Sequence, residues 1–330
     1  MVRPSRKAFL SVTAAAIAGF GVPGSTRASS ARILEYKLPR PNAFPHDPAL
    51  APDGSVWYTD QANSRIGRLD PQSGAVVDFA THTPDAGPHG ITIAADGTVW
   101  FTENSAGRIG RFDPADKKFS EFSLPGGARD PHTPILHQGR LWFTVQGGNQ
   151  YGILDPHTGK LEMHRVATPG AHPYGIAAAP DGSIWIALFG TNKLGRVDPQ
   201  THEMREFTLP SEGSRPRRLT IDERGVIWYG DYARSMLGAF DPQAERFREW
   251  RTPDGDGGPY GIAIGPDKRI WYDESNADTM IGFDPATQQT IGVSIPTKGS
   301  MVRNVAVDVK RNAIWLALSG VQRIGRLDLR

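Results

Sequence analysis

Seven tryptophans recur along the chain at an almost constant interval of 42 to 44 residues. They are Trp57, Trp100, Trp142, Trp185, Trp228, Trp271 and Trp315. An aspartate lies thirteen residues after each of them, and in six of the seven cases a proline follows that aspartate. This regularity predicts that the chain folds as seven copies of one unit, so any motif must be compared across the copies before it is interpreted.

Each unit has the pattern of four short β-strands separated by turns. In the second unit the expected strands are "HGITIA" (89–94), "TVWFTE" (98–103), "RIGRF" (108–112) and "FSEFSLP" (119–125). The first is almost uniformly apolar, as in a buried strand, whereas the last alternates between apolar and polar residues, as in a half-exposed strand. Four-stranded units of this length indicate an all-β protein, a seven-bladed β-propeller.

The two ends of the propeller are predicted to pair with each other. The last unit stops at "RIGRLDLR" (323–330), after its third strand, while "ILEYKLP" (33–39) resembles the fourth strands "EFSLP" (121–125) and "EFTLP" (206–210). Pairing of the N-terminal strand with the last unit would close the ring and remove its exposed sheet edges. Residues 32–330 are therefore expected to form a single propeller domain.

The first 31 residues have the layout of a secretory signal peptide. A basic start precedes a short apolar run from Ala8 to Val22, and small residues follow near Ala28 and Ala31. "SRKAFL" resembles a twin-arginine export signal in which Lys7 replaces the second arginine. The layout predicts a periplasmic or secreted protein, with no membrane span after cleavage.

Composition excludes several classes of function. The chain has no cysteine, which rules out disulfides, thiolate catalysis and cysteine-bound zinc. Its formal net charge of +2 gives no sign of a nucleic-acid or anionic-membrane partner. We expect a monomer that binds a small molecule.

Two positions in each unit are expected to meet at one mouth of the central funnel. The residue that opens the first strand is, in order around the ring, His46, His89, His132, Tyr174, Arg217, Tyr260 and Arg303. The residue three places after each repeated tryptophan is Asp60, Glu103, Val145, Leu188, Asp231, Glu274 and Leu318. One sector of the funnel is thus predicted to be rich in imidazole and carboxylate groups, and the opposite sector in arginine and tyrosine.

This arrangement has a functional and a structural interpretation. The histidine sector, with Glu103 and the nearby Asp130, could bind a ligand or a metal ion. Equally, polar side chains at a propeller mouth could hydrogen-bond only to loop backbone or to water. The histidines outside the mouth, His137, His157, His164 and His202, are expected in turns or outer strands, at the surface.

The repeats resemble those of the virginiamycin B lyase family. The units "GPHGITIAADGTVWFTENSAGRIGRFDP" (87–114) and "HPYGIAAAPDGSIWIALFGTNKLGRVDP" (172–199) carry the resemblance, which extends over residues 32–330. It implies an elimination that opens a lactone, in which a histidine removes the proton alpha to a carbonyl. A Mg²⁺ ion held by two carboxylates would stabilise the enolate.

The catalytic positions implied by this resemblance are not matched in straight register. Arg303 stands where the catalytic histidine of the last blade belongs, no acid lies near Ser319, and Tyr260 replaces the histidine of the preceding blade. The departure leaves the activity open.

A constellation displaced around the ring is one hypothesis. In it His132 is the base and His89 assists, while Asp130 and Glu103 bind Mg²⁺ with help from Gln146. The substrate-binding residues would be His46, Tyr174, Arg217, Tyr260 and Arg303.

Two other classes of function compete with the lyase. A non-catalytic binding propeller would need no cofactor, and Arg217 and Arg303 could then hold an anionic ligand. A metal-dependent lactone hydrolase would add water to its product, whereas elimination would not, so product mass separates the two reactions.

Overall fold

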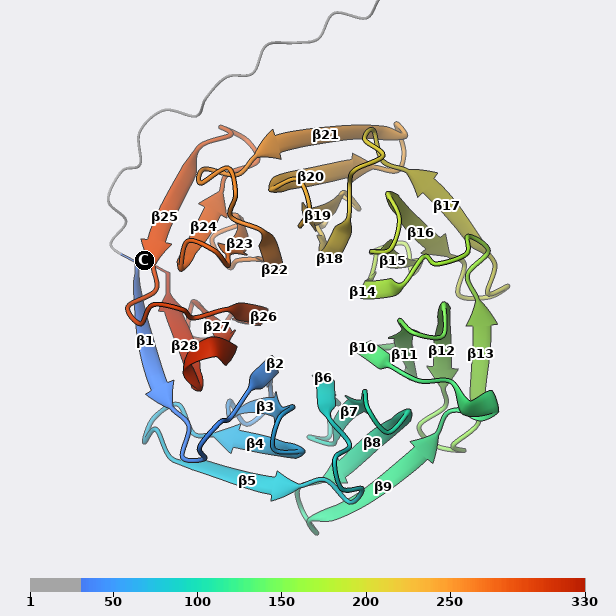
Figure 1. The fold of residues 1–330 in the computed structure, drawn as a ribbon, viewed down its shortest axis with the longest axis vertical. Helices are drawn as coiled ribbons and strands as arrows, with labels where there is room; N and C mark the ends of the chain where they lie inside the picture. Colours follow the sequence, from blue (N-terminus) through green and yellow to red (C-terminus); the bar gives the residue numbers. More distant parts are fainter. Residues whose placement is uncertain (1–30, 330) are drawn as a thin grey trace, which may run out of the picture.

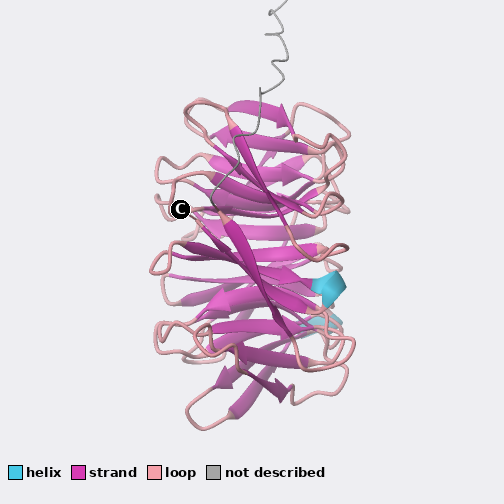
Figure 2. Ribbon diagram, turned by 90° about the vertical axis from the view of Figure 1, so that its left-hand side faces the viewer, coloured by secondary structure: helices cyan, strands magenta, loops and turns pink. Residues whose placement is uncertain are grey.

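The protein is a closed ring of seven four-stranded antiparallel sheets (Figure 1). The structure is a computed structural model that describes residues 31–329. Apart from Ala31, the predicted signal peptide lies outside these residues. The side view shows a flattened disc with loops on both faces (Figure 2). The prediction of an all-β, seven-bladed propeller is confirmed.

The strands follow one another in the order that the repeats predict. Blades one to four contain β2 (Pro45–Leu50), β3 (Val56–Asp60), β4 (Arg65–Leu69), β5 (Val76–Ala80), β6 (Pro88–Ile93), β7 (Val99–Glu103), β8 (Arg108–Asp113), β9 (Lys118–Ser123), β10 (Pro131–His137), β11 (Arg140–Val145), β12 (Gln150–Leu154), β13 (Leu161–Arg165), β14 (Pro173–Ala178), β15 (Ile184–Leu188), β16 (Lys193–Val197) and β17 (Met204–Thr208). Blades five to seven contain β18 (Pro216–Ile221), β19 (Ile227–Asp231), β20 (Met236–Asp241), β21 (Arg246–Arg251), β22 (Pro259–Ile264), β23 (Ile270–Glu274), β24 (Thr279–Phe283), β25 (Thr290–Ser294), β26 (Val302–Asp308), β27 (Ala313–Leu318) and β28 (Arg323–Asp328). Two short 3₁₀ turns, η1 (Pro125–Gly127) and η2 (Ser319–Val321), lie in loops.

The N-terminal strand closes the ring as the fourth strand of blade seven. β1 (Arg32–Lys37) pairs antiparallel with β28 from Arg32 opposite Asp328 to Lys37 opposite Arg323. The carboxylate of Glu35 on β1 accepts a hydrogen bond of 2.9 Å from the backbone N–H of Thr297 in the loop before blade seven. Glu121 in blade two makes the same contact with Thr83, at 2.8 Å. The closing strand therefore provides the same loop contact that fourth strands provide elsewhere.

Aromatic side chains fill the space between neighbouring blades. Trp57, only 2% exposed, stacks on Phe79 of its own blade and contacts Phe112 of the next, with ring centroids 5.9 and 5.7 Å apart. A glycine in the third strand makes room for such rings. A Cβ atom at Gly110 would lie 2.2 Å from the Phe101 ring, which is far inside van der Waals contact. The repeated tryptophans thus belong to the scaffold rather than to the funnel.

Candidate functional site

Each innermost strand begins with a β-bulge, which places two successive residues opposite one residue of the second strand. In blade one the register shifts between Pro45 and Pro48, so that two residues, His46 and Asp47, occupy the space opposite Thr59. The same shift occurs at the start of the innermost strand in all seven blades. The second of the two residues is a glycine in three blades, and in the other four it adds a deeper side chain to the channel: Asp47, Thr133, Arg218 and Asn304. These four side chains form a partial second layer, which the sequence alone did not predict.

The first layer brings together the opening residues that the sequence predicts. Its histidines follow one another around the axis, with ring centroids 3.6 Å apart for His46 and His89 and 3.8 Å apart for His89 and His132. The His132 ring in turn lies 3.8 Å from that of Tyr174, whose hydroxyl is hydrogen-bonded to the hydroxyl of Tyr260 across the channel. These five side chains are at most 4% exposed, so the layer is packed tightly.

The positions of these residues are set by hydroxyl groups in the second strands. Thr59 donates a hydrogen bond of 2.7 Å to the carbonyl oxygen of His89, and Thr102 donates one of 2.8 Å to that of His132. Thr144 makes the equivalent bond to Tyr174, at 2.7 Å. Each threonine joins one blade to the next and fixes the backbone that carries the next residue of the layer.

The three histidines are neutral at neutral pH. Burial holds the pKa of His46 well below its usual range, and the nearby charge of Arg218 lowers it further. Burial followed by the neighbouring His89 lowers the pKa of His132 in the same direction. The histidine sector consequently offers hydrogen-bonding nitrogen atoms without positive charge.

The opposite sector carries two guanidinium groups packed on aromatic rings. Arg217 lies 3.9 Å from the ring centroid of Tyr260 and 4.5 Å from that of Tyr232. Arg303 lies 5.2 Å from the Tyr260 centroid and 5.5 Å from that of Phe44. Within residues 31–329 neither arginine is ion-paired to a carboxylate, and the Nε atom of each is buried without a hydrogen-bond partner. This sector therefore holds positive charge that the protein itself does not neutralise.

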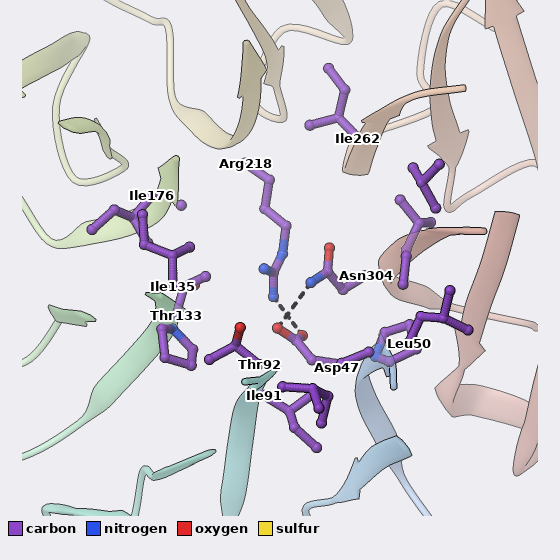
Figure 3. A pocket seen from close by; sticks show the side chains of 18 of the residues that line it. Asp47, Leu50, Ile91, Thr92, Thr133, Ile135, Ile176, Arg218, Ile262 and Asn304 are labelled. Atoms are coloured by element: carbon purple, nitrogen blue, oxygen red, sulfur yellow. Dashed lines mark hydrogen bonds and ion pairs between the residues drawn. The ribbon is translucent and has the colours of Figure 1, made fainter. Parts of the chain in front are cut away.

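A buried ion pair forms the second layer, directly behind the histidines. A guanidinium nitrogen of Arg218 lies 2.7 Å from Oδ1 of Asp47, and the side-chain amide of Asn304 donates a hydrogen bond of 2.9 Å to Oδ2 (Figure 3). Nδ1 of His46 lies 2.9 Å from Oδ1 of the same carboxylate. Asp47 and Arg218 balance each other in charge, so the uncompensated charge of the channel belongs to Arg217 and Arg303.

Beside the ion pair lies a cavity that is lined by both polar and apolar side chains. Its volume is about 400 Å³, and Figure 3 shows isoleucines from several blades around the polar centre. The side chains of Ile91, Ile135, Ile176 and Ile262 form much of its wall. The first layer, which includes Arg217 and Arg303, lies between this cavity and the mouth.

The acidic residues predicted to bind Mg²⁺ do not converge with the histidines. Glu103 lies at the end of β7, and its charged neighbours are Glu121 and Arg108 on the outer strands of its own blade. Asp130 is half-buried in the loop before β10, where its carboxylate accepts a hydrogen bond from the side-chain amide of Asn104. The backbone N–H of Gln146 bonds to the carbonyl of Asp130, at 2.9 Å.

The donor groups near the histidines do not suit Mg²⁺, which prefers oxygen ligands. Among the described residues, the group in the channel with three ligand atoms close enough for one ion is His46, Asp47 and His89, and it contains neither Asp130 nor Glu103. Nitrogen atoms predominate in that group, and both carboxylate oxygens of Asp47 already bond to Arg218 and Asn304. The Mg²⁺ site with Asp130, Glu103 and Gln146 therefore remains a prediction, since these residues belong to neither of the groups of three metal ligands found among the described residues.

Glu103 instead behaves as a buried neutral acid. Both of its carboxyl oxygens are buried without a hydrogen-bond partner. Burial, followed by the charge of Glu121, raises its pKa from 4.5 to about 8. Between these two values the unfolded chain releases the proton while the native protein keeps it, so native stability falls as pH rises through this window.

We expect Glu103→Gln to stabilise the protein at alkaline pH. The amide removes the cost of a buried ionisable group, so the free energy of unfolding should rise by about 2–4 kcal/mol at pH 8.5 and change little at pH 4. Denaturant unfolding of both proteins at the two pH values measures the difference. Glu203→Gln, at an exposed position, is the control. An equal effect of Glu103→Gln at both pH values would contradict the assignment.

Comparison with known proteins identifies the family of this chain. The virginiamycin B lyase family matches residues 25–189 and again residues 159–330, which together include the whole propeller. The chain belongs to the virginiamycin B lyase family. A search of the curated proteins found no significant match.

Solved structures of this family have the same fold. A streptogramin B lyase structure is 25% identical, with a TM-score of 0.84, over 91% of this chain and 98% of that one. A catalytically inactive histidine-to-alanine variant of virginiamycin B lyase from Staphylococcus aureus, solved with quinupristin, is 24% identical with a TM-score of 0.85, over 91% and 100%. The β-propeller domain of Cps50 (Swd1) from Myceliophteria thermophila shares the fold at 10% identity, with a TM-score of 0.72, over 90% and 100%.

Membership of the virginiamycin B lyase family does not by itself assign a reaction to this member. Arg303 and Tyr260, which replace the two histidines that the resemblance implies, lie in the first layer and contact each other. His132, the predicted base, is 2% exposed, and its Nδ1 atom is hydrogen-bonded to the hydroxyl of Thr133 at 3.0 Å. The described residues include no helix that is long and apolar enough to cross a bilayer.

Proposed function

We propose that this member of the virginiamycin B lyase family is an exported protein that binds a small organic anion at the mouth of its channel. Arg217 and Arg303 would hold the anion. The observation that carries the proposal is the pair of guanidinium groups without carboxylate partners, each with a buried and unpartnered Nε atom. A buried donor without a partner costs about 1–3 kcal/mol, and an anionic ligand would supply the missing acceptor.

The charge balance of the channel supports an anion over a cation or a neutral ligand. Asp47 is neutralised by Arg218, and the three histidines of the first layer are uncharged at neutral pH. The two remaining arginines give the mouth a net positive charge, which raises the local concentration of anions. No carboxylate of the first layer would repel them.

The surroundings of the arginines favour an anion that carries an aromatic or apolar group. Arg217 lies 4.8 Å from the ring centroid of Phe189 and 4.5 Å from that of Tyr232, while Phe44 lies beside Arg303. Phe44, Phe189 and Tyr232 are partly exposed, so part of their surface is open to a ligand. Rings of this kind bind apolar groups, and the guanidinium groups between them would orient the acid.

Substituting either arginine should weaken anion binding. Benzoate is a suitable probe because it combines a carboxylate with an aromatic ring. We expect Arg217→Gln and Arg303→Gln each to weaken binding about 10- to 100-fold, the effect of losing a charge-assisted hydrogen bond. Calorimetric titration measures the affinity.

The control for this experiment is Arg248→Gln, which removes an equal charge from an exposed position on β21 and should leave benzoate binding unchanged. Equal binding of benzoate by the wild type and both mouth variants would overturn the proposal. So would the absence of any binding by the wild type to benzoate, phenylphosphate and benzenesulfonate.

Elimination of a streptogramin lactone is a second candidate, and family membership favours it. Incubation of the purified protein with quinupristin and Mg²⁺, followed by mass spectrometry, tests it. An open-chain product of unchanged mass would establish a lyase, and a product heavier by one water would establish a hydrolase. Intact quinupristin after long incubation would remove both reactions and leave the binding function.

A further inference from the structure

A second cluster of side chains that could bind a metal ion lies at the outer strands of blades three and four, away from the central channel. Glu162 and His164 belong to β13, the outermost strand of blade three, and His202 belongs to the turn before β17 in blade four. Residues two apart on a strand point to the same side, so Glu162 and His164 face the neighbouring blade together. From the sequence alone, both histidines are expected at the surface.

The three side chains converge on one point. Oε2 of Glu162 lies 3.9 Å from Nε2 of His164 and 3.7 Å from Nδ1 of His202. One ligand atom from each of the three residues lies within 4.8 Å of the other two. Both nitrogen-to-oxygen distances are too long for hydrogen bonds, so the carboxylate oxygen and the two imidazoles are not satisfied by one another. Nε2 of His164 is in fact buried without a partner.

These distances are close to those of a tetrahedral zinc site. Metal–ligand bonds of about 2.0–2.1 Å at tetrahedral angles place neighbouring ligand atoms about 3.3 Å apart. The two separations from the carboxylate oxygen exceed this value by about half an ångström, and the two imidazole nitrogens lie within 4.8 Å of each other. Rotations of the side chains would bring the three atoms to the distances of a metal site. Two histidines and one carboxylate, with a fourth position left for water, form a known ligand set for zinc and similar ions.

Aromatic neighbours already orient the two imidazoles. The ring of Tyr151 stacks on that of His164, with centroids 5.1 Å apart and planes 17° from parallel, and its hydroxyl donates a hydrogen bond of 2.5 Å to the carbonyl oxygen of His202. Trp142 meets the His202 ring edge-on at 5.7 Å. Side chains that hold metal ligands in place in this way reduce the cost of bringing them together around an ion.

We propose that Glu162, His164 and His202 form a binding site for a divalent transition-metal ion of the Zn²⁺ class, which joins blade three to blade four. The side chains are each about 30% exposed, so an ion can reach the site from solvent. Lys160 lies 2.7 Å from the other carboxylate oxygen, Oε1, and leaves Oε2 to the metal. This site is separate from the anion site proposed at the mouth and does not depend on it.

Titration of the tag-free protein with Zn²⁺, in competition with a chromophoric chelator, tests the site. The wild type is expected to bind one equivalent of Zn²⁺ with high affinity and to melt at a higher temperature in its presence. Glu162→Gln, His164→Gln and His202→Asn should each weaken binding at least about tenfold and abolish the rise in melting temperature. Asparagine is chosen at position 202 because His202 has a positive φ of 59°, which asparagine tolerates well.

His157→Gln is the matched control, because His157 is an exposed histidine in the β12–β13 turn of the same blade. It should leave both the affinity and the melting temperature unchanged. Zn²⁺ binding that survives the substitutions of His164 and His202 would place the metal elsewhere and overturn the proposal, as would a wild type that binds no Zn²⁺. Since Glu162→Gln preserves the shape of the side chain, loss of binding in that variant cannot be ascribed to misfolding if its apo form melts like the wild type.

Discussion

Arg218→Met is expected to lower the free energy of unfolding by about 3–5 kcal/mol, one of the largest effects of any single substitution in this protein. The substitution leaves the Asp47 carboxylate, which is 1% exposed, buried without its countercharge. The hydrogen bond from Asn304 remains, but one amide does not replace a guanidinium group. Guanidinium chloride unfolding, followed by tryptophan fluorescence, measures the change.

The partner substitution shows whether the unpaired charge causes this loss. In the double variant Asp47→Asn/Arg218→Met both charges are absent, and we expect at least half of the lost stability to return. Arg248→Met, on the exposed face of β21, should change the free energy of unfolding by no more than about 0.5 kcal/mol. A double variant as unstable as the sum of the two single variants would show that the ion pair is not the source of the effect.

Removal of β1 is expected to have a still broader effect. A chain that begins at residue 38 loses six residue pairs with β28, the buried side chain of Ile33 and the contact between Glu35 and Thr297. β28 then becomes an open edge available for pairing with other molecules. We expect a melting temperature lower by about 10 °C or more and concentration-dependent association, measured by calorimetry and light scattering against the chain that begins at Ala31.

A circular permutant provides the control for this truncation. Arg32 pairs with Asp328, so residues 31–43 can be joined behind residue 330 through a short turn like those that connect third and fourth strands in the other blades. The permutant restores the missing strand from the other end of the chain and should recover most of the stability. If the truncated chain instead melts like the longer one, ring closure by β1 contributes little to the stability of the propeller.

The architecture could be predicted from the sequence because its determinants are repeated and local. The interval between tryptophans defines the blades, and the similarity of "ILEYKLP" to other fourth strands identifies the closing strand. The first layer of the channel followed from the same repeat, because the opening position is occupied by His46, His89 and their equivalents in every blade. These predictions follow from a comparison of the seven repeats with one another, and none of them depends on how the side chains pack.

The other parts of the site could not be predicted because they depend on contacts between different repeats and on a local irregularity of the strands. The β-bulge adds a second inward side chain in four of the blades, and two of these, Asp47 and Arg218, are 171 residues apart and meet only across the channel. Glu103 was predicted to lie at the mouth beside the histidines. Successive side chains of a strand point to opposite sides, and because Thr102 faces the next blade, Glu103 faces the other way, toward Glu121 and Arg108 of its own blade. The cluster of His164 and His202 joins two blades at their outer strands, where the sequence of one unit contains no sign of its neighbour.

The hydroxyl bonds between blades support only part of the first layer. Thr59, Thr102 and Thr144 anchor the strands that carry His89, His132 and Tyr174. The next two blades have Ala187 and Gly230 at the corresponding position and cannot make that bond. The strands that carry His89, His132 and Tyr174 are therefore tied to the preceding blade by a side-chain hydroxyl, whereas those that carry Arg217 and Tyr260 lack this tie. We expect the arginine side of the mouth to adjust more readily than the histidine side to acids of different width.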